Sequence, residues 1–204
     1  MNINKKDKII EAAFLLSLEN GFDRVSMKQI QEESGLSAGS IYYYFKDKNE
    51  ILVAMFNKYF IGTVPLVKER LRNTEGTFID KLTSIFKHDI NSFNQIEINS
   101  SDMSNFTMKY GDYLSLSMSI YHQYPEIRPL FIELYNGYND YFRELLQEAI
   151  ENNEVRDDVD IDILVMHVLS SFRGCLDLWM NQLEFSIEEL VEANLTLLVE
   201  AIKK

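Results

Sequence analysis

The first fifty-two residues carry helix caps and glycines at such short intervals that only a set of small helices can satisfy them. An apolar run over residues 8–19 ends at Asn20-Gly21, which is typical of a helix C-cap. Phe22 is expected to fold back on this first helix. Ser26-Met27-Lys28-Gln29 forms a capping box, so a second helix is predicted to begin at Met27 and to end at Ser34-Gly35.

A tight turn and a further cap define the next two helices. Leu36 and Ile41 have the spacing of a hydrophobic staple around Ser37, which predicts a third helix over residues 38–44. Asp47-Lys48-Asn49-Glu50 is another capping box and opens a fourth helix that continues past Phe60. Two short helices that are joined by a glycine turn and braced on both sides indicate a helix-turn-helix DNA-binding arrangement.

The third predicted helix has an unusual composition for a purely structural element. It begins with Ala38-Gly39-Ser40, although glycine in a helix costs roughly 1 kcal/mol relative to alanine. Tyr42-Tyr43-Tyr44 then places three aromatic rings in succession around the helix, so one or two of them must face outward. Small residues allow a helix to enter a major groove, and tyrosines can contact phosphates and thymine methyl groups.

Residues 35–52, with the sequence GLSAGSIYYYFKDKNEIL, closely resemble the signature of TetR-family transcriptional regulators. The resemblance extends over roughly residues 8–56. It implies an all-α fold, with a helix-turn-helix DNA-binding domain over residues 1–52 and a helical effector-binding and dimerisation domain over residues 53–204. It further implies a ligand-responsive repressor that binds a pseudo-palindromic operator on double-stranded DNA as a homodimer, without enzymatic activity or a cofactor.

The resemblance also implies which residues contact DNA. Position 38 is often lysine and position 44 often histidine in this family, so Ala38 and Tyr44 are departures, and the operator sequence cannot be taken from relatives. Leu36, Ile41 and Phe45 are expected to be core residues only. The implied DNA-binding residues are Ser26, Lys28, Ser37, Ala38, Gly39, Ser40, Tyr42, Tyr43, Tyr44 and Lys48.

Charge is distributed unevenly along the chain, whose net charge is -12. Residues 1–60 contain eight basic and eight acidic residues, so the whole negative surplus lies in residues 61–204. Only the N-terminal part is therefore suited to approach a polyanion. A single cysteine, Cys175, fits a reducing compartment, and no signal peptide or apolar run of membrane-spanning length is evident. We expect a cytoplasmic protein without a membrane partner.

Apolar periodicity predicts that the rest of the chain is helical, apart from an Asn/Ser-rich loop over residues 94–102. Prolines 125 and 129 mark one helix boundary, and Ser186 with Glu189 forms a capping box for the last helix. The predicted helices are the continuation of the fourth helix over 55–71 and those over 77–93, 103–110, 112–124, about 130–152, 160–183 and 187–202.

Residues 53–204 are rich in aromatic and methionine side chains. Each of these residues taken alone is explained as an ordinary core residue. As a set, and given the resemblance, they could line a cavity for an apolar or amphipathic effector such as an acyl chain or a lipophilic drug. The two late helices resemble the dimer interface of the family, where Ser170 and Gly174 would allow close helix approach. The candidate effector-binding residues are Phe86, Met103, Phe106, Tyr110, Met118, Tyr121, Tyr135, Tyr138, Phe172 and Trp179.

Other kinds of chemistry have weaker support in the sequence. Residues 35–39 match the G-x-S-x-G nucleophile elbow of hydrolases, but that elbow must follow a strand, and a polar helix is predicted before it. Residues 158–162 begin like a calcium loop, yet Ile163 replaces its glycine and Leu169 its closing glutamate, so no metal is expected. The alternative function is a helical small-molecule-binding protein or enzyme that has lost DNA binding.

Overall fold

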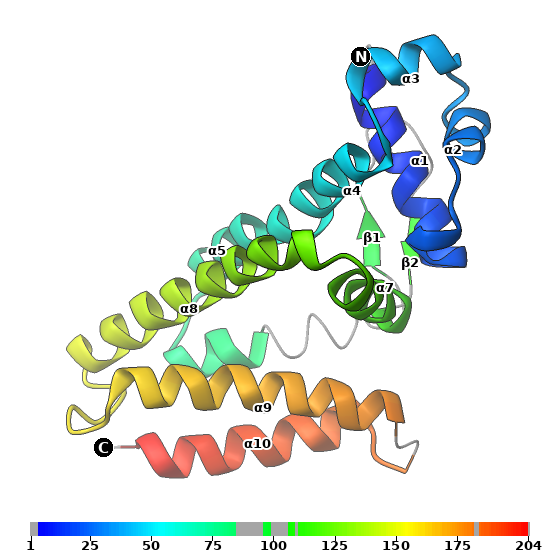
Figure 1. The fold of residues 1–204 in the computed structure, drawn as a ribbon. Helices are drawn as coiled ribbons and strands as arrows, with labels where there is room; N and C mark the ends of the chain where they lie inside the picture. Colours follow the sequence, from blue (N-terminus) through cyan, green and yellow to red (C-terminus); the bar gives the residue numbers. More distant parts are fainter. Residues whose placement is uncertain (1–3, 85–95, 99–105, 109, 182–183, 204) are drawn as a thin grey trace. The chain divides into compact units, whose positions relative to one another are not determined.

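The computed structural model describes residues 4–84, 96–98, 106–108, 110–181 and 184–203. These residues are helical apart from short connections and one pair of short strands (Figure 1). The predicted all-α architecture is therefore confirmed. The chain divides into two compact units, one formed by residues 1–63 and 93–134 and the other by residues 64–92 and 135–204.

The N-terminal helices follow the predicted caps closely. The side chain of Asn4 accepts a hydrogen bond from the Lys6 N–H at 3.1 Å, which starts the first helix a turn earlier than predicted. Gly21 and Gly35 both have positive φ angles, 80° and 66°, which glycine adopts without strain. The elements are α1 Lys5–Asn20, the 3₁₀ turn η1 Phe22–Arg24, α2 Met27–Ser34 and α3 Ala38–Tyr44.

The predicted capping boxes are present, with one variation. Ser26 Oγ accepts from the Gln29 N–H while Gln29 Oε1 accepts from the Ser26 N–H, so the first box is reciprocal. Asp47 Oδ1 accepts from the Glu50 N–H at 2.9 Å, whereas Glu50 Oε2 accepts from the N–H of Lys46. Both arrangements satisfy amide groups that the first turn of a helix leaves without partners.

The helix that opens at Asp47 is not continuous, which corrects the prediction for residues 48–71. It consists of α4 Lys48–Phe56, a π-helical turn η2 Asn57–Ile61, and α5 Thr63–Arg72. A Cβ atom on Gly62 would lie 2.4 Å from the Lys58 carbonyl oxygen, so the turn requires glycine there. Pro65 lacks the N–H that a regular helix needs, and Gly62 and Pro65 together explain the interruption.

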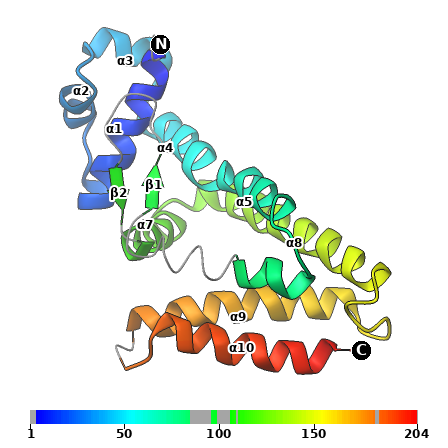
Figure 2. The ribbon, with the colours of Figure 1, turned by 180° about the vertical axis from the view of Figure 1, so that it is seen from behind.

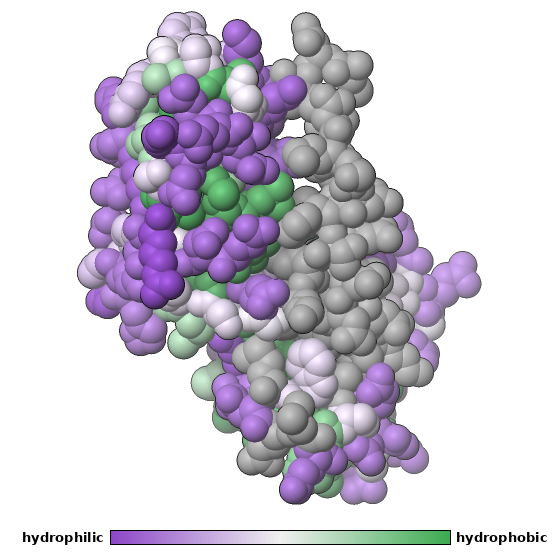
Figure 3. Space-filling view, turned by 90° about the vertical axis from the view of Figure 1, so that its right-hand side faces the viewer, coloured by the Kyte–Doolittle hydropathy of each residue, from purple (hydrophilic) through white to green (hydrophobic). Residues whose placement is uncertain are grey.

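This helical stretch, Lys48–Arg72, is also long and apolar enough to cross a membrane by length and composition alone. Ile51, Leu52, Met55 and Phe56 in its first half are fully buried inside the protein, so their apolar character is explained by core packing. On the face shown in Figure 3, hydrophilic side chains cover most of the visible surface of the described residues.

A two-stranded antiparallel ribbon replaces part of the predicted loop and helix between residues 94 and 110. β1 Ile96–Ile98 pairs with β2 Phe106–Met108, with Ile96 opposite Met108. The prediction of a helix over 103–110 is therefore wrong. The ribbon is followed by α7 Tyr110–Gln123 and the 3₁₀ turn η3 Pro125–Ile127, and the prediction of a helix over 112–124 is confirmed.

Aromatic rings dominate the core of the first unit. Phe14 stacks on Tyr59 with ring centroids 3.9 Å apart, and Phe60 stacks on Tyr113 of α7. Tyr113 Oη also donates a hydrogen bond to the Tyr59 carbonyl at 3.2 Å. Burying a phenylalanine side chain stabilises a fold by about 1.5–3 kcal/mol, so these contacts hold α7 firmly against α1 and η2.

The second unit is built from long helices, whose predicted bounds are confirmed to within a few residues. Its core contains Leu82 from a helical segment over residues 78–84, together with Leu146, Val165 and Leu198 from the three helices that follow. The prediction for residues 85–93 lies outside the described residues. These helices are α8 Arg128–Glu151, whose first residues belong to the first unit, α9 Ile161–Asn181 and α10 Ile187–Ile202.

The pair α9 and α10 lies side by side in both ribbon views (Figures 1 and 2). The predicted capping box of Ser186 and Glu189 starts α10. Between the two helices, Asn194 Nδ2 donates to Cys175 Sγ at 3.2 Å and to the Leu190 carbonyl at 2.8 Å. Cys175 is buried there, and its burial raises the pKa of the thiol.

Candidate nucleic-acid interface

Helix α3 presents a large exposed surface for an element of seven residues. Ile41, only 1% exposed, fixes its inner face to the core, while Ala38 and Gly39 are exposed. Tyr42 is 57% exposed and Tyr43 82% exposed. The prediction that one or two of the three tyrosines face outward is therefore confirmed, and two large rings contribute little to the core.

Gly39 has no conformational or packing role within the described residues. Its φ angle lies outside the left-handed region, and a Cβ atom at this position would have no heavy-atom neighbour within 4 Å. A side chain here would therefore fit the isolated protein and would favour the helix. The described residues therefore give no internal reason for glycine at this position.

The third tyrosine and its neighbours have structural roles. Tyr44 is half-buried against the core, and its ring meets the Tyr43 ring edge-on at a centroid distance of 5.0 Å. Phe45 is buried and Leu36 packs against the same core, so the expectation that Leu36, Ile41 and Phe45 are core residues is confirmed. Of the three tyrosines, Tyr42 and Tyr43 are the ones available for an external contact.

Two of the three serines that the sequence predicts to contact DNA, Ser26 and Ser37, are also helix caps. Ser37 Oγ accepts from the Ser40 N–H at 3.2 Å and lies 3.0 Å from Ser40 Oγ. Ser26 Oγ donates to Gln29 Oε1 at 2.8 Å. All three hydroxyl groups are therefore engaged within the protein, and Ser26 and Ser37 would remain helix caps whether or not DNA is bound.

Exposed lysines precede and follow α3 in the sequence. Lys28 Nζ lies 3.7 Å from Glu32 Oε1, and Lys46 Nζ lies 3.8 Å from Glu50 Oε1, each pair one helical turn apart. Both lysine side chains are more than four-fifths exposed, and ion pairs of this kind stabilise a protein by at most about 1 kcal/mol. Each ammonium group can therefore turn to a phosphate at little cost.

Lys48, at the start of α4, is held much more firmly. Its Nζ donates to the Asp23 carbonyl oxygen at 3.1 Å and lies 4.4 Å from the centroid of the Phe22 ring. Burial in this position lowers the pKa of the ammonium group, although the Asp23 carboxylate acts in the opposite direction. The sequence does not predict this contact, because the residues are more than twenty positions apart and no local pattern links them.

The candidate effector-binding residues are spread over both units. Met118 and Tyr121 lie on α7 with exposed side chains, and Tyr135 on α8 is exposed as well. Phe106 begins β2 and Tyr110 begins α7, while Phe86 and Met103 lie outside the described residues. The partly buried members are Tyr138, Phe172 and Trp179, all in the second unit.

Two hollows on the described surface are lined by residues that do not include Met118, Tyr121, Tyr135, Tyr138, Phe172 or Trp179. The larger, of about 730 Å³, is an open groove between α1 and α4 that Lys6, Phe45 and Asn57 line with others. The smaller lies beside Phe78 and Glu148. The assignment of effector residues stays a prediction.

The candidate dimer residues lie on an exposed apolar stripe of α9. Ser170 is exposed, and a Cβ atom on Gly174 would have no neighbour within 4 Å. Ile163 and Met166 are exposed on the same helical face at spacings of three, four and seven residues. Such a face can admit a second helix at close range.

The residues needed for other chemistry are not brought together. Residues 35–39 follow helix α2 and not a strand, so they do not form a hydrolase elbow. Within the residues that the structure describes, no three His, Cys, Asp or Glu side chains are grouped so that they could hold a metal ion.

Two short helices joined at a left-handed glycine, with an exposed second helix, form a helix-turn-helix arrangement, which is typical of DNA-binding proteins. Residues 9–55 match the family model described as bacterial regulatory proteins, tetR family. The chain is also similar to a fatty acid metabolism regulator protein of Bacillus subtilis (strain 168), at 24% identity over 199 residues, covering 96% of this chain and 94% of the relative. The chain therefore resembles the TetR family of transcriptional regulators, and its residues 9–55 match the model of that family, as the sequence predicts.

Solved structures show the same fold. The reduced form of NemR from E. coli aligns with a TM-score of 0.77 at 18% identity and covers 98% of both chains. FadR from Bacillus subtilis, in complex with stearoyl-CoA, aligns with a TM-score of 0.64 at 21% identity and covers 96% of this chain and 98% of that one. At these identities the alignments establish the arrangement of helices and no more.

Proposed function

We propose that this regulator is a ligand-responsive repressor that binds a pseudo-palindromic operator as a homodimer. The observation that carries the proposal is the outward face of α3, where Ala38 and Gly39 leave the backbone open and Tyr42 and Tyr43 project beside it. A helix of this kind fits a major groove, and the hydroxyl groups of the two tyrosines are available to contact phosphates. The ten DNA-binding residues named from the sequence are proposed to form this surface.

The apolar stripe of α9 supports the homodimer. A two-fold dimer would allow two helix-turn-helix domains to contact successive half-sites on one side of DNA. Leu178 on α9 and Leu197 on α10 add to the exposed apolar surface of the same helix pair. We propose that Ser170 and Gly174 lie at the centre of this interface.

Met166→Glu is expected to convert the dimer into a monomer. In a two-fold interface each substitution places a charge on both copies, and opposing like charges cost several kcal/mol, which corresponds to at least about 100-fold in dimer affinity. Sedimentation velocity at micromolar concentration measures the effect. Leu66→Glu, at a leucine of α5 with the same 64% exposure as Met166, is the control and should leave the dimer intact. A dimeric Met166→Glu variant would contradict the interface.

We propose that the effector is an apolar or amphipathic molecule. Two observations support this class: the aromatic and methionine residues of the body, and the similarity to a fatty acid metabolism regulator. The effector acts by binding two conformations with different affinities, which couples its site to the DNA-binding head. We assign the head to residues 1–52, the body to residues 53–204, and the protein to the cytoplasm.

Selection of genomic DNA fragments on the purified protein tests the function directly. We expect enrichment of a short sequence with two-fold symmetry, followed by footprinting of that site upstream of the regulated gene. A correctly folded protein that enriches no sequence would favour the alternative, a helical small-molecule-binding protein or enzyme that has lost DNA binding. The relatives named above are regulators, and they indicate no enzyme family.

A further inference from the structure

The contact between Lys48 and Phe22 joins the start of α4 to the turn between α1 and α2. The ammonium group lies over the face of the ring at 4.4 Å and reaches the carbonyl oxygen of the next residue, Asp23, at 3.1 Å. An ammonium group has three donors, and Asp23 accepts one of them. The remaining donors stay available on a side chain whose position is already fixed.

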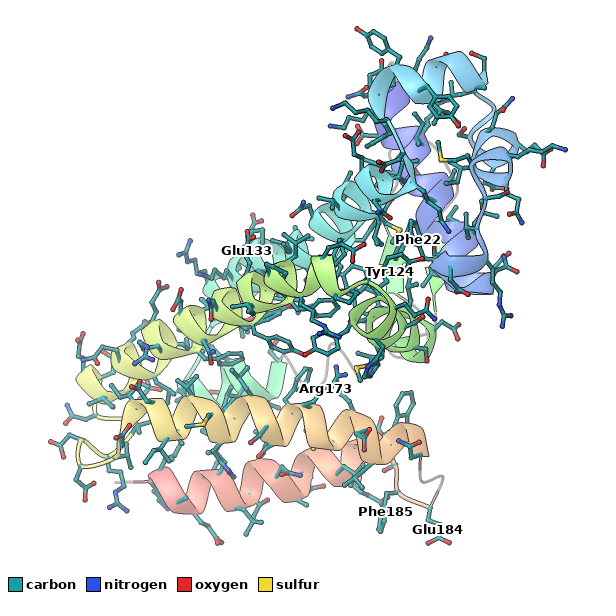
Figure 4. All side chains as sticks on the ribbon, in the orientation of Figure 1. Phe22, Tyr124, Glu133, Arg173, Glu184 and Phe185 are labelled. Carbon is teal, nitrogen blue, oxygen red and sulfur yellow. The ribbon has the colours of Figure 1, made fainter. Side chains whose placement is uncertain are left out.

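Phe22 is itself held rigidly. It is buried in the first unit, and its carbonyl accepts the N–H of Val25 at 3.2 Å. The ring also meets the Tyr124 ring edge-on, with centroids 5.5 Å apart, and the two rings lie next to each other in Figure 4. The ring therefore contacts both Lys48 of α4 and Tyr124, the residue that follows α7, and it cannot shift without disturbing these contacts.

The charged side chains of Asp23 and Arg24 follow Phe22 and affect the charge around Lys48. The Asp23 carboxylate attracts Lys48 and would oppose a phosphate, but Arg24 Nε lies 4.0 Å from Asp23 Oδ2 and offsets part of this negative charge. Ser26, a proposed phosphate contact, follows two residues after Arg24. Lys48 is thus fixed beside the part of the chain that leads into another proposed DNA-binding residue.

We propose that Phe22 is a positioning residue for DNA binding, which holds the Lys48 ammonium group in place for a backbone phosphate. The inference rests on the proposed function, because it assumes that Lys48 contacts DNA. A lysine that is ordered before DNA arrives loses less side-chain entropy on binding than a free one. Phe22 acts through Lys48 and does not itself contact DNA.

The salt dependence of operator binding is the readout that separates this role from a structural one. Each phosphate contact contributes about 0.9 to the slope of log affinity against log salt concentration. We expect Phe22→Leu to reduce the slope by about 0.9 for each DNA-binding head, as Lys48→Met does. The double variant should show no further reduction, because both substitutions remove the same contact.

Phe14→Leu is the matched control, because Phe14 is an equally buried ring of the same core and no lysine lies over it in the described contacts. It should lower stability in the same way and leave the slope unchanged. If Phe22→Leu unfolds, Phe22→Met offers a larger side chain without the ring, and the same slope is expected. A wild-type slope in a folded Phe22 variant, or additive losses in the double variant, would overturn the proposal. Failure of the wild-type protein to bind any operator would instead count against the proposed function.

Discussion

The double variant Tyr42→Ala with Lys48→Met is expected to abolish operator binding while the protein remains folded. Tyr42 is 57% exposed, so its removal leaves no cavity, and methionine keeps the apolar stem of Lys48 against Phe22. Each lost contact to DNA costs about 1–3 kcal/mol, so we expect a loss of at least about 100-fold in affinity. A gel-shift titration measures the loss, and circular dichroism checks the fold.

A matched pair of substitutions in the second unit provides the control. Phe185 is an exposed aromatic residue between α9 and α10, and Lys68 Nζ lies 5.4 Å from the centroid of the Tyr141 ring, much as Lys48 lies over Phe22. Phe185→Ala with Lys68→Met likewise removes an exposed aromatic ring and an ammonium group, and should leave operator affinity unchanged. Wild-type affinity in the Tyr42 and Lys48 variant would show that these residues do not contact DNA.

Gly39→Leu is expected to make the protein more stable and to prevent it from binding its operator. Beyond the local backbone of α3 and the residues adjacent to Gly39, no heavy atom lies within 4 Å of the missing Cβ, and leucine favours a helix over glycine by up to about 1 kcal/mol. This gain corresponds to an increase of about 2–4 °C in the melting temperature of a chain of this size. The same side chain would occupy the space through which the backbone of α3 approaches DNA, so binding should fall at least about 100-fold.

A variant that melts at a higher temperature and yet binds the operator more weakly cannot owe its weaker binding to partial unfolding. Thr196→Leu is the control, because Thr196 is an exposed, uncharged position of α10. This variant adds the same apolar side chain to a helix surface and should bind the operator normally. Undiminished binding by Gly39→Leu would mean that the front of α3 does not enter the groove.

Local capping chemistry accounts for the parts of the fold that the sequence predicts well. Ser26, Ser37, Asp47 and Ser186 each satisfy amide groups within three residues, so the helix starts can be read without knowledge of the tertiary structure. The outward position of Tyr42 and Tyr43 follows equally from local geometry, because three successive rings cannot all face one core.

The two short strands show where local patterns are ambiguous. Phe106, Met108 and Tyr110 alternate with Thr107 and Lys109, which is the period of a strand, but a run of eight residues is compatible with a helix as well. Ile96 and Ile98 show the same alternation around Glu97. The pairing between the two segments makes them strands, and a short apolar run does not show which segment it will pair with.

The π-helical turn and the Lys48 contact could be predicted only in part. Gly62 and Pro65 are helix-breaking residues that indicate an interruption after Phe60, although they do not specify a π turn. The position of Lys48 over Phe22 depends on how α4 packs against the turn between α1 and α2. Such a contact follows from tertiary packing, so the sequence alone predicts the residue type and not its partner.

The burial of Cys175 has a practical consequence for measuring whether the two DNA-binding heads of the proposed dimer move. It is the single cysteine of the chain, and its raised pKa leaves little of the reactive thiolate at neutral pH. Maleimide reagents should therefore label a cysteine introduced at an exposed position, such as Glu33 of α2, without prior removal of the native one. Spin or fluorescence labels at that position would report the head-to-head distance with and without a candidate effector.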